Sequence, residues 1–310
     1  MTSQALDPRI YCSLASLLKQ ETYSRQFVLG SHFKPAGILA GRHRSRLRGM
    51  GLNFEELRAY QRGDSLHQID ARTSARMGKP YVRVYSQETD REIYIAVDQR
   101  RGMLFGSQQY TKSLIAAELA SLLAWNFQQQ GDRVGSLMVS DQQPTLYKAE
   151  RGRKPILRWL QQLTAVNQAL NIKHDHANQD DWQTLLEPLS ASFNSHKLLA
   201  LVTHLDAISS DDVRYLQQLS QRTSIMLFLI SDPLERDLSQ AEGLTVSQNR
   251  LQLNIPQQQG VHKKFAQLYD EKLHDVQQAL SQCEFVTAQL DTLTPAYQQC
   301  LTLLGGGSIA

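Results

Sequence analysis

Short, continuous apolar runs separated by amphipathic segments constrain the fold of this chain more than any other feature. Residues 92–97, 197–202 and 224–230 are apolar along most of their length and have the size of strands. Strands of this kind are buried on both faces, as in parallel sheets covered by helices. Helical patterns at 111–130 and 211–221 follow two of these runs. We therefore expect an α/β fold with a mostly parallel sheet and helices on both faces.

Further segments extend this alternation toward both ends. A helical pattern at 10–29 precedes a break rich in proline and glycine, and Asn53 followed by Glu55 and Glu56 predicts a second, capped helix. The other expected elements are a strand at 81–85, a hairpin of 134–140 with 145–149, helices at 154–163, 179–189 and 261–282, a hairpin at 244–255, a strand at 284–290 and a short last helix. The 3 tryptophans all fall in predicted helices, and we expect them in the core.

The run at 92–97 ends at Asp98, which opens a loop containing glycine. In open α/β sheets, ligands bind outside the carboxyl ends of the strands. This position marks the expected functional edge of the sheet. The same loop places Arg100 and Arg101 where a metal site would use small hydroxyl ligands.

Length and composition describe an ordinary globular protein. The chain has 310 residues, 41% of them hydrophobic and 20% charged, which is enough for a substantial core. No apolar run approaches the ~18 residues of a membrane-spanning helix. The first residues lack the pattern of a secretory signal. Because Cys12, Cys283 and Cys300 are widely spaced and odd in number, they predict neither a disulfide framework nor a zinc site. We expect a soluble, cytoplasmic protein without membrane insertion.

Positive charge is concentrated in the first part of the chain. Residues 1–85 hold 14 Lys+Arg against 6 Asp+Glu, a net of +8, while the remainder holds 19 against 24, a net of −5. Within this part, arginine recurs at every second position, namely Arg42, Arg44, Arg46 and Arg48. In an extended segment these side chains share one face. The stripe is typical either of an anion or partner site or of a solvated strand edge, and pairing with nearby carboxylates is a further alternative.

Motifs for catalysis are sparse. The sequence has no glycine-rich phosphate loop, no nucleophile elbow and no reactive cysteine context. His174 and His176, with Asp175, Asp180 and Asp181, resemble a metal cluster, but an isolated His-x-His in a polar loop is more often solvated. Asp70 with Glu88 and Asp90 resembles a nuclease carboxylate set without its lysine. We predict no catalytic residue.

An ordered set of motifs indicates a known family. It comprises Arg58-Ala59-Tyr60-Gln61-Arg62-Gly63-Asp64, Ile69-Asp70, Ser74-Ala75-Arg76, Tyr81-Val82-Arg83, Glu88, Met103, Phe105-Gly106-Ser107, Gly131-Asp132-Arg133-Val134-Gly135, Asp232-Pro233 and Glu235. This order resembles domain of unknown function family 58, the von Willebrand factor A-like proteins found beside MoxR-type AAA+ ATPases. The resemblance covers residues 40–240 and departs at Ala71, where that family usually has tryptophan.

The resemblance implies a von Willebrand A-like, Rossmann-type sheet at residues 86–300. A smaller N-terminal helix and β region at 1–85 would pack on that sheet, and 301–310 would form a flexible tail. Within the N-terminal region we interpret one set of charged and polar residues as a structural motif whose charged members form a buried salt-bridge lattice. The set is Arg58, Tyr60, Gly63, Asp64, Asp70 and Arg76.

The resemblance also implies where a metal would bind. Von Willebrand A domains that bind a divalent cation use an Asp-x-Ser-x-Ser loop and a later aspartate. Here Asp98 is kept, whereas Arg100 and Gly102 stand at the serine positions and His204 at the later aspartate, with Asp206 close by. We therefore expect no metal and no cofactor. Arg100 would take the cation's place, either pairing with Asp98 or meeting a partner's carboxylate.

These features together suggest a protein-interaction module and not an enzyme. The resemblance implies an adaptor to a MoxR-type AAA+ ATPase and to other von Willebrand A-like proteins, in assembly or maturation of a client complex. Its expected partner contacts are Asp98, Arg100, Arg101, His204 and Asp206. The alternative is an anion- or nucleic-acid-binding protein that uses the arginine stripe. We favour the first reading over binding of nucleic acid.

Overall fold

The computed structural model describes residues 6–27, 52–61, 69–87, 91–171, 180–193, 197–238, 245–248, 251–254, 259–281 and 285–304. The chain divides into two compact units. Unit 1 comprises residues 1–40 and 91–310, and unit 2 comprises residues 41–90. The boundary thus falls at a different place from the one expected after residue 85.

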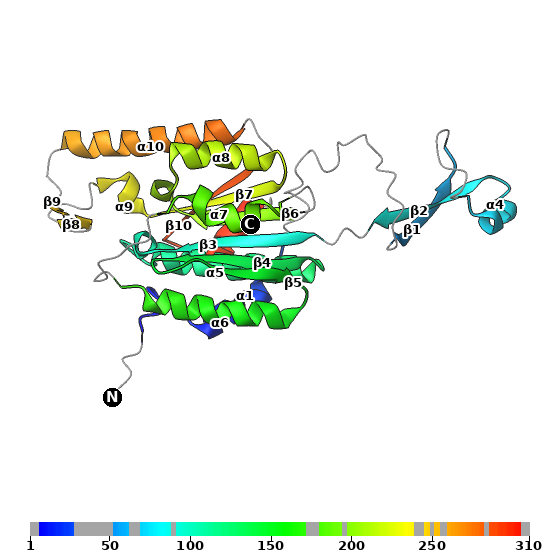
Figure 1. Cartoon of the computed structure of the whole chain (residues 1–310), viewed down its shortest axis with the longest axis horizontal. Coiled ribbons are helices and arrows are strands. Elements are labelled where there is room, and N and C mark those ends of the chain that lie inside the picture. The colour runs from blue at the N-terminus through cyan, green and yellow to red at the C-terminus, as the bar shows by residue number, and fades with distance from the viewer. Residues whose placement is uncertain are drawn as a thin grey trace. The chain divides into compact units, whose positions relative to one another are not determined.

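A six-stranded sheet forms the centre of unit 1, with the strand order β10-β7-β6-β3-β4-β5 (Figure 1). Its strands are β3 (Glu92–Gln99), β4 (Arg133–Ser140), β5 (Thr145–Glu150), β6 (Lys197–Thr203), β7 (Ser224–Ser231) and β10 (Phe285–Asp291). Neighbouring strands run parallel, except that β5 pairs antiparallel with β4. The expected α/β class and the hairpin at its edge are confirmed.

Strand β3 is central, between β4 and β6. Every residue of β3 after Glu92 is buried, as its apolar sequence predicts. In the register of the sheet, Val97 lies beside Val202 of β6, and Asp98 lies beside Val139 of β4. Because these strands are parallel, the residues at their carboxyl ends meet at one edge of the sheet.

Helices cover both faces of the sheet, as expected (Figure 1). One face carries α1 (Leu14–Ser24), α5 (Lys112–Gln129), α6 (Arg153–Ala169) and α11 (Ala296–Leu304), and the other carries α7 (Trp182–Ser190), α8 (Ser210–Ser220) and α10 (Gln259–Ser281). Short helices follow three strands at the carboxyl edge, namely η2 (Arg101–Met103) after β3, η3 (Leu205–Ala207) after β6 and α9 (Pro233–Arg236) after β7. Among the described residues, no helix is both long enough and apolar enough to cross a membrane.

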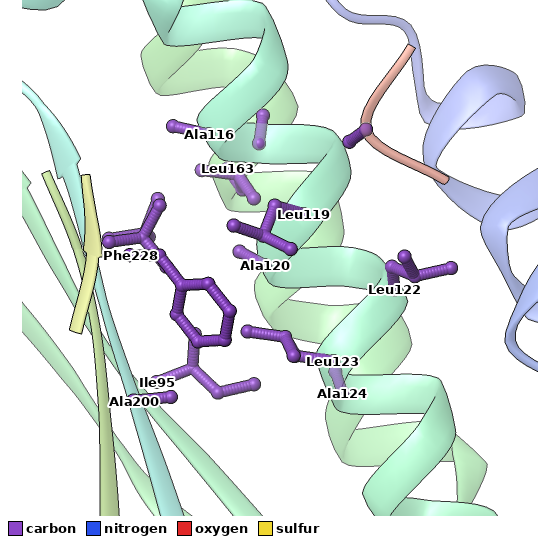
Figure 2. Packing of buried hydrophobic residues seen from close by; sticks show 14 of the residues in the cluster. Ile95, Ala116, Leu119, Ala120, Leu122, Leu123, Ala124, Leu163, Ala200 and Phe228 are labelled. Atoms are coloured by element: carbon purple, nitrogen blue, oxygen red, sulfur yellow. The ribbon is translucent and has the colours of Figure 1, made fainter. Parts of the chain in front are cut away.

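Helix α5 is buried almost all round, because it lies between the sheet and a second layer of helices. In Figure 2, Leu119, Ala120 and Leu123 point toward the sheet, where Phe228 of β7 lies. Leu122 points the opposite way. The three tryptophans are also buried, one each in α5, α6 and α7, so their predicted place in the core is confirmed.

The N-terminal helix is shorter than the predicted segment at 10–29. It begins after Ser13, whose side chain accepts a hydrogen bond from the backbone N–H of Ser16 in a capping box. The helix is anchored to α5, because the buried hydroxyl of Ser121 donates to the carbonyl of Leu17 at 2.7 Å. These contacts make α1 part of unit 1.

Unit 2 contains an antiparallel pair of strands, β1 (Leu52–Ala59) and β2 (Tyr81–Gln87). Between them, α4 (Ala71–Met77) starts at Asp70, whose Oδ1 accepts from the N–H of Thr73 at 2.6 Å. Asp70 is therefore buried as a helix cap.

The predicted helix at Asn53 is wrong, since this segment is strand β1. Asn53 lies opposite Ser86 of β2, and the register shifts between Phe54 and Glu56. Pairing with β2 satisfies the backbone groups that a helix would have satisfied internally, and this long-range pairing overrides the local capping signal. The predicted hairpin near residue 250 is confirmed as β8 (Thr245–Gln248) and β9 (Leu251–Asn254).

Candidate functional site

The carboxyl edge of the sheet gathers several buried polar side chains. Asp98 lies near the end of β3, Thr203 ends β6, and Asp232 directly follows β7. All three have no exposed surface. Buried polar groups must be hydrogen-bonded to be tolerated, so each needs a partner within the fold.

Asp98 is enclosed by a fork of hydrogen bonds from Arg100. Nε of Arg100 donates to Oδ1 of Asp98 at 2.9 Å, and Nη2 donates to Oδ2 at 2.8 Å. The backbone N–H of Arg100 also donates to Oδ1, and the hydroxyl of Thr203 donates to Oδ2 at 2.7 Å. Both carboxylate oxygens are thus held by donors from the protein itself.

The environment keeps both members of this pair charged. Burial alone would raise the pKa of Asp98, but the hydrogen bonds and the charge of Arg100 outweigh it and hold that pKa below its ordinary value. Burial alone would lower the pKa of Arg100, and the hydrogen bonds to Asp98 outweigh it in turn and raise that pKa. The pair is therefore an ionised, charge-assisted contact inside the protein.

Arg100 also joins the β3 loop to α7. Its Nη1 donates to the carbonyl of Asp180 at 3.0 Å, and its guanidinium carbon lies 5.2 Å from the ring centre of Trp182, a cation–π contact. The side chain of Arg100 is 10% exposed. Of the two roles predicted for Arg100, the structure shows the pairing with Asp98.

The loop after Arg100 is held by a second aspartate and packs against a histidine. The backbone N–H of Arg101 donates to both carboxylate oxygens of Asp141, at 3.1 and 3.0 Å. A Cβ atom at Gly102 would lie 3.2 Å from Cε1 and Nε2 of His204. A side chain at position 102 would therefore crowd the imidazole.

His204 lies next to the ion pair but remains uncharged at neutral pH. Its Nδ1 is 3.9 Å from Oδ2 of Asp98, too far for a hydrogen bond, and no described group pairs with this nitrogen. Burial and the nearby charge of Lys112 lower the pKa of His204 to about 4, although Asp98 opposes the shift. His204 therefore borders the site without adding charge to it.

Asp206 does not take the place of the missing aspartate. It is 70% exposed in η3, and its carboxylate accepts from Nζ of Lys272 on α10 at 3.1 Å. The predicted contact set stays a prediction. In the structure, Asp98 and Arg100 are buried and hold the loop from inside.

A second buried cluster was not among the predicted site residues. Asp232 accepts from the N–H and hydroxyl of Ser107 and from the hydroxyl of Thr292 at 2.6 Å. The buried ammonium of Lys112 pairs with Glu235, which also closes a capping box with Asp232. The sequence signal was the Asp-Pro-x-Glu pattern, which predicts a capped helix at this point.

This donor set does not fit a divalent cation. Mg²⁺ prefers oxygen ligands in octahedral geometry. Here the guanidinium of Arg100 already donates to both carboxylate oxygens of Asp98, and the loop positions that would supply hydroxyl ligands are arginine and glycine. Among the described residues, no three His, Cys, Asp or Glu side chains gather as a metal cluster. Arg100 supplies the positive charge that the carboxylate requires.

Several predicted residues lie outside the described part of the chain. They are Arg42, Arg44, Arg46, Arg48, Gly63, Asp64, Glu88, Asp90, His174, Asp175 and His176. In unit 2, Arg58 and Tyr60 are half-buried, and Nη1 of Arg58 donates to the carbonyl of Ala59 at 3.3 Å. Arg76 is exposed on the last turn of α4, so the predicted buried lattice does not extend to it.

The fold and the site together define a class of α/β protein with a mostly parallel sheet. In this class an aspartate lies near the end of a central strand, and an arginine two residues later neutralises its charge. The chain belongs to the family described as "Protein of unknown function DUF58", which matches residues 56–274. It is similar to uncharacterized proteins of Mycobacterium bovis and Mycobacterium tuberculosis, at 28% identity over 133 residues. That stretch is 43% of this chain and 42% of each relative, so the match spans less than half of either protein.

Proposed function

We propose that this protein is a non-enzymatic interaction module that binds its partner at the carboxyl edge of a von Willebrand A-like sheet. The observation that carries the proposal is the fork between Arg100 and Asp98, both nearly or fully buried. In a metal-dependent adhesion site, the loop and a partner's carboxylate share a bound cation. Here arginine orders the loop, so a preformed edge can meet a partner without metal.

The pairing of charges at this edge supports binding over catalysis. Asp98 is tied to Arg100, Glu235 to Lys112, and Asp232 to two hydroxyls. A catalytic acid or base needs a proton or a lone pair directed at the substrate. Buried groups whose hydrogen bonds are all made within the protein instead hold loops in place. At this edge Asp206 is 70% exposed and Arg101 is partly exposed, so both side chains can be reached by a partner.

The partner follows from the family resemblance in the region of Arg58 to Arg76. We propose a MoxR-type AAA+ ATPase, together with other von Willebrand A-like proteins, acting on a client complex during its assembly or maturation. A preorganised surface loses less conformational entropy on binding, and the loop at Asp98 is held in place by the hydrogen bonds from Arg100. The chain's membership in its family is shown, and the adaptor role is our proposal beyond it.

A pull-down with the tagged, purified chain in lysate of the native cell tests this function. Mass spectrometry should identify an AAA+ ATPase with the wild-type chain. Arg101→Glu should reduce its recovery, because the change reverses a charge at the proposed edge. The matched control Arg158→Glu reverses a 63% exposed arginine on α6 and should leave recovery unchanged. Absence of the ATPase from wild-type eluates, or equal recovery with Arg101→Glu, would contradict the proposal.

The alternative function, binding of an anion or a nucleic acid, is supported by the net charge of +8 in residues 1–85. Its stripe, Arg42 to Arg48, lies outside the described residues. Binding of this kind weakens steeply with salt. A gel shift with DNA and RNA at low and physiological salt tests it, and no shift at either salt concentration would dismiss it.

A further inference from the structure

The two edge strands of the six-stranded sheet differ in how they are protected against pairing with another strand. At one edge, β5 carries the exposed charged side chains of Lys148 and Glu150, and its register with β4 shifts between Val134 and Ser136. Charges and irregular pairing are means by which edge strands avoid other chains. At the other edge, β10 pairs in unbroken register with β7, and it is uncharged until its last residue, Asp291. The β10 edge therefore lacks the protection that β5 has.

The last residue of β10 shows which backbone groups point away from the sheet. The side-chain amide of Gln299, on α11, donates to the carbonyl of Asp291 at 2.9 Å and accepts from its N–H at 2.8 Å. Because backbone direction alternates along a strand, the N–H and C=O of Phe285, Thr287 and Gln289 also point away from β7. Among the described residues, no group bonds to these N–H and C=O groups. They form an open row of donors and acceptors that ends at Gln299.

The helix that holds Gln299 carries no charge. Helix α11 contains no charged residue, and its Leu303 is 50% exposed. Leu303 lies one helical turn beyond Gln299, on the same side of the helix. An uncharged edge of this kind can be recognised by main-chain hydrogen bonds and apolar contact, which is how an added strand extends a sheet.

From these observations we infer that the β10 edge pairs antiparallel with the β10 edge of a second copy of this chain. In an antiparallel ladder, residues whose backbone groups point at the neighbouring strand lie opposite one another. Gln299 already occupies the backbone of Asp291. The register that uses every open residue therefore places Phe285 opposite Gln289 of the second copy, and Thr287 opposite its own counterpart.

The sequence of β10 suits pairing with itself. In this register the uncharged Phe285 and Gln289 are cross-strand neighbours, and the two Thr287 side chains form a Thr–Thr pair, which is a favourable contact. Asp291 lies beyond the paired residues, so no like charges of the two strands are brought opposite one another. Because the paired stretch has no charge that would select a different strand, its symmetry favours a second copy over an unrelated extended segment.

Pairing of this kind joins two six-stranded sheets into one continuous sheet. Since the two β10 strands run antiparallel, the carboxyl edges of the two copies face in opposite directions. Each copy keeps its own candidate site at Asp98, so the dimer presents two contact edges. The inference goes beyond the proposed function and does not depend on it, because pairing at β10 requires no other protein.

Sedimentation velocity of the full-length chain over a wide range of protein concentration tests the inference. We expect a reversible shift from monomer to dimer as the concentration rises. Thr287→Pro removes an N–H that points away from β7 and leaves the β10–β7 ladder intact, so it should keep the fold and abolish the dimer. The matched control Thr287→Val keeps this N–H and the β-branched shape, and it should dimerise like wild type. Circular dichroism and the melting temperature show whether Thr287→Pro is folded.

A charge variant tests the same pairing without changing the backbone, and it decides the matter if Thr287→Pro does not fold. Thr287→Lys places two ammonium groups opposite one another and should weaken dimerisation by roughly fivefold. Gln161→Lys adds the same charge at an exposed position of α6 and should have no effect.

Four results would overturn the inference. They are a wild-type chain that stays monomeric at every concentration, unchanged dimerisation of Thr287→Lys, unchanged dimerisation of folded Thr287→Pro, and loss of the dimer in Thr287→Val. If the wild type is monomeric and Thr287→Pro loses a protein that the wild type recovers in the pull-down, the edge pairs with a strand of that protein and not with a second copy.

Discussion

The guanidinium of Arg100 donates to one oxygen of Asp98 from Nε and to the other from Nη2, at 2.9 and 2.8 Å. Fork-shaped pairing of this kind fixes both side chains in position as well as in charge. Because Asp98 is fully buried, the pair also fixes the first turn of the loop at the edge of the sheet. The stability of the fold and the shape of its proposed contact edge thus depend on one ion pair.

Removing Arg100 should destabilise the protein strongly. Arg100→Met leaves the carboxylate of Asp98 buried without a counter-ion, and breaking one side of a buried pair costs about 3–5 kcal/mol. Urea unfolding followed by circular dichroism measures the free energy of unfolding. The double variant Asp98→Asn with Arg100→Met removes both charges and should recover part of the loss. A loss below ~1 kcal/mol in Arg100→Met, the level of a surface pair, would contradict this view.

His204 should make stability depend on pH below neutrality. Its pKa is lowered to about 4 in the folded protein, whereas an unfolded histidine titrates near 6.5, so the unfolded state binds the extra proton first. The stabilisation is present above pH 6.5 and is lost as the pH falls toward 4, by roughly 2–3 kcal/mol at pH 4.5. Urea unfolding at pH 7 and 4.5 should show a smaller loss for His204→Gln than for wild type. His274→Gln, at an exposed position of α10, is the control and should match wild type.

Glu118 should contribute the opposite dependence on pH. Burial raises the pKa of this α5 carboxyl to about 7, so above that pH the folded protein holds an ionised, largely buried carboxylate. Glu118→Gln should therefore raise the free energy of unfolding at pH 8, by roughly 1–2 kcal/mol, and have little effect at pH 5. Thermal unfolding at the two pH values measures the difference. Equal effects at both would contradict the shifted pKa.

Substitution by alanine should change the stability of the protein in opposite directions at two glycines. A Cβ at Gly106, in the loop between η2 and α5, would lie 2.0 Å from the carbonyl oxygen of Tyr110, so Gly106→Ala must displace backbone and should cost about 2 kcal/mol or more. At Gly260, in α10, a Cβ meets nothing within 4 Å. Gly260→Ala should stabilise the protein by about 0.5–1 kcal/mol through helix propensity. The two melting temperatures, measured side by side, check both signs.

Much of unit 1 could be predicted from the sequence, because its strands are apolar along their length and its helices have clear periodicity. The run ending at Asp98 and the helix capped by Thr111 are read from local pattern alone. The strand at Asn53 could not be predicted in this way. Its neighbour in the sheet, β2, lies beyond α4 in the sequence, and the local capping signal pointed to a helix.

The contacts of the candidate site also differ in how far they could be predicted, because some join residues close in sequence and others join distant ones. The pairing of Asp98 with Arg100 joins residues two apart, so the sequence could suggest it as one of two alternatives. The cluster at Asp232 joins Ser107, 125 residues away, and Thr292, 60 residues away. Such contacts depend on strand order, which no single stretch of sequence specifies. Likewise, the motif does not indicate that Asp98 is buried beneath the fork of hydrogen bonds from Arg100.

Titration calorimetry of the purified chain with Mn²⁺ at neutral pH tests the central claim most directly. We propose that Arg100 takes the place of a cation at Asp98 and that the edge of the sheet needs no metal. We therefore expect no stoichiometric heat of binding for the wild type or for Asp98→Asn. Stoichiometric Mn²⁺ binding to the wild type that Asp98→Asn abolishes would contradict it.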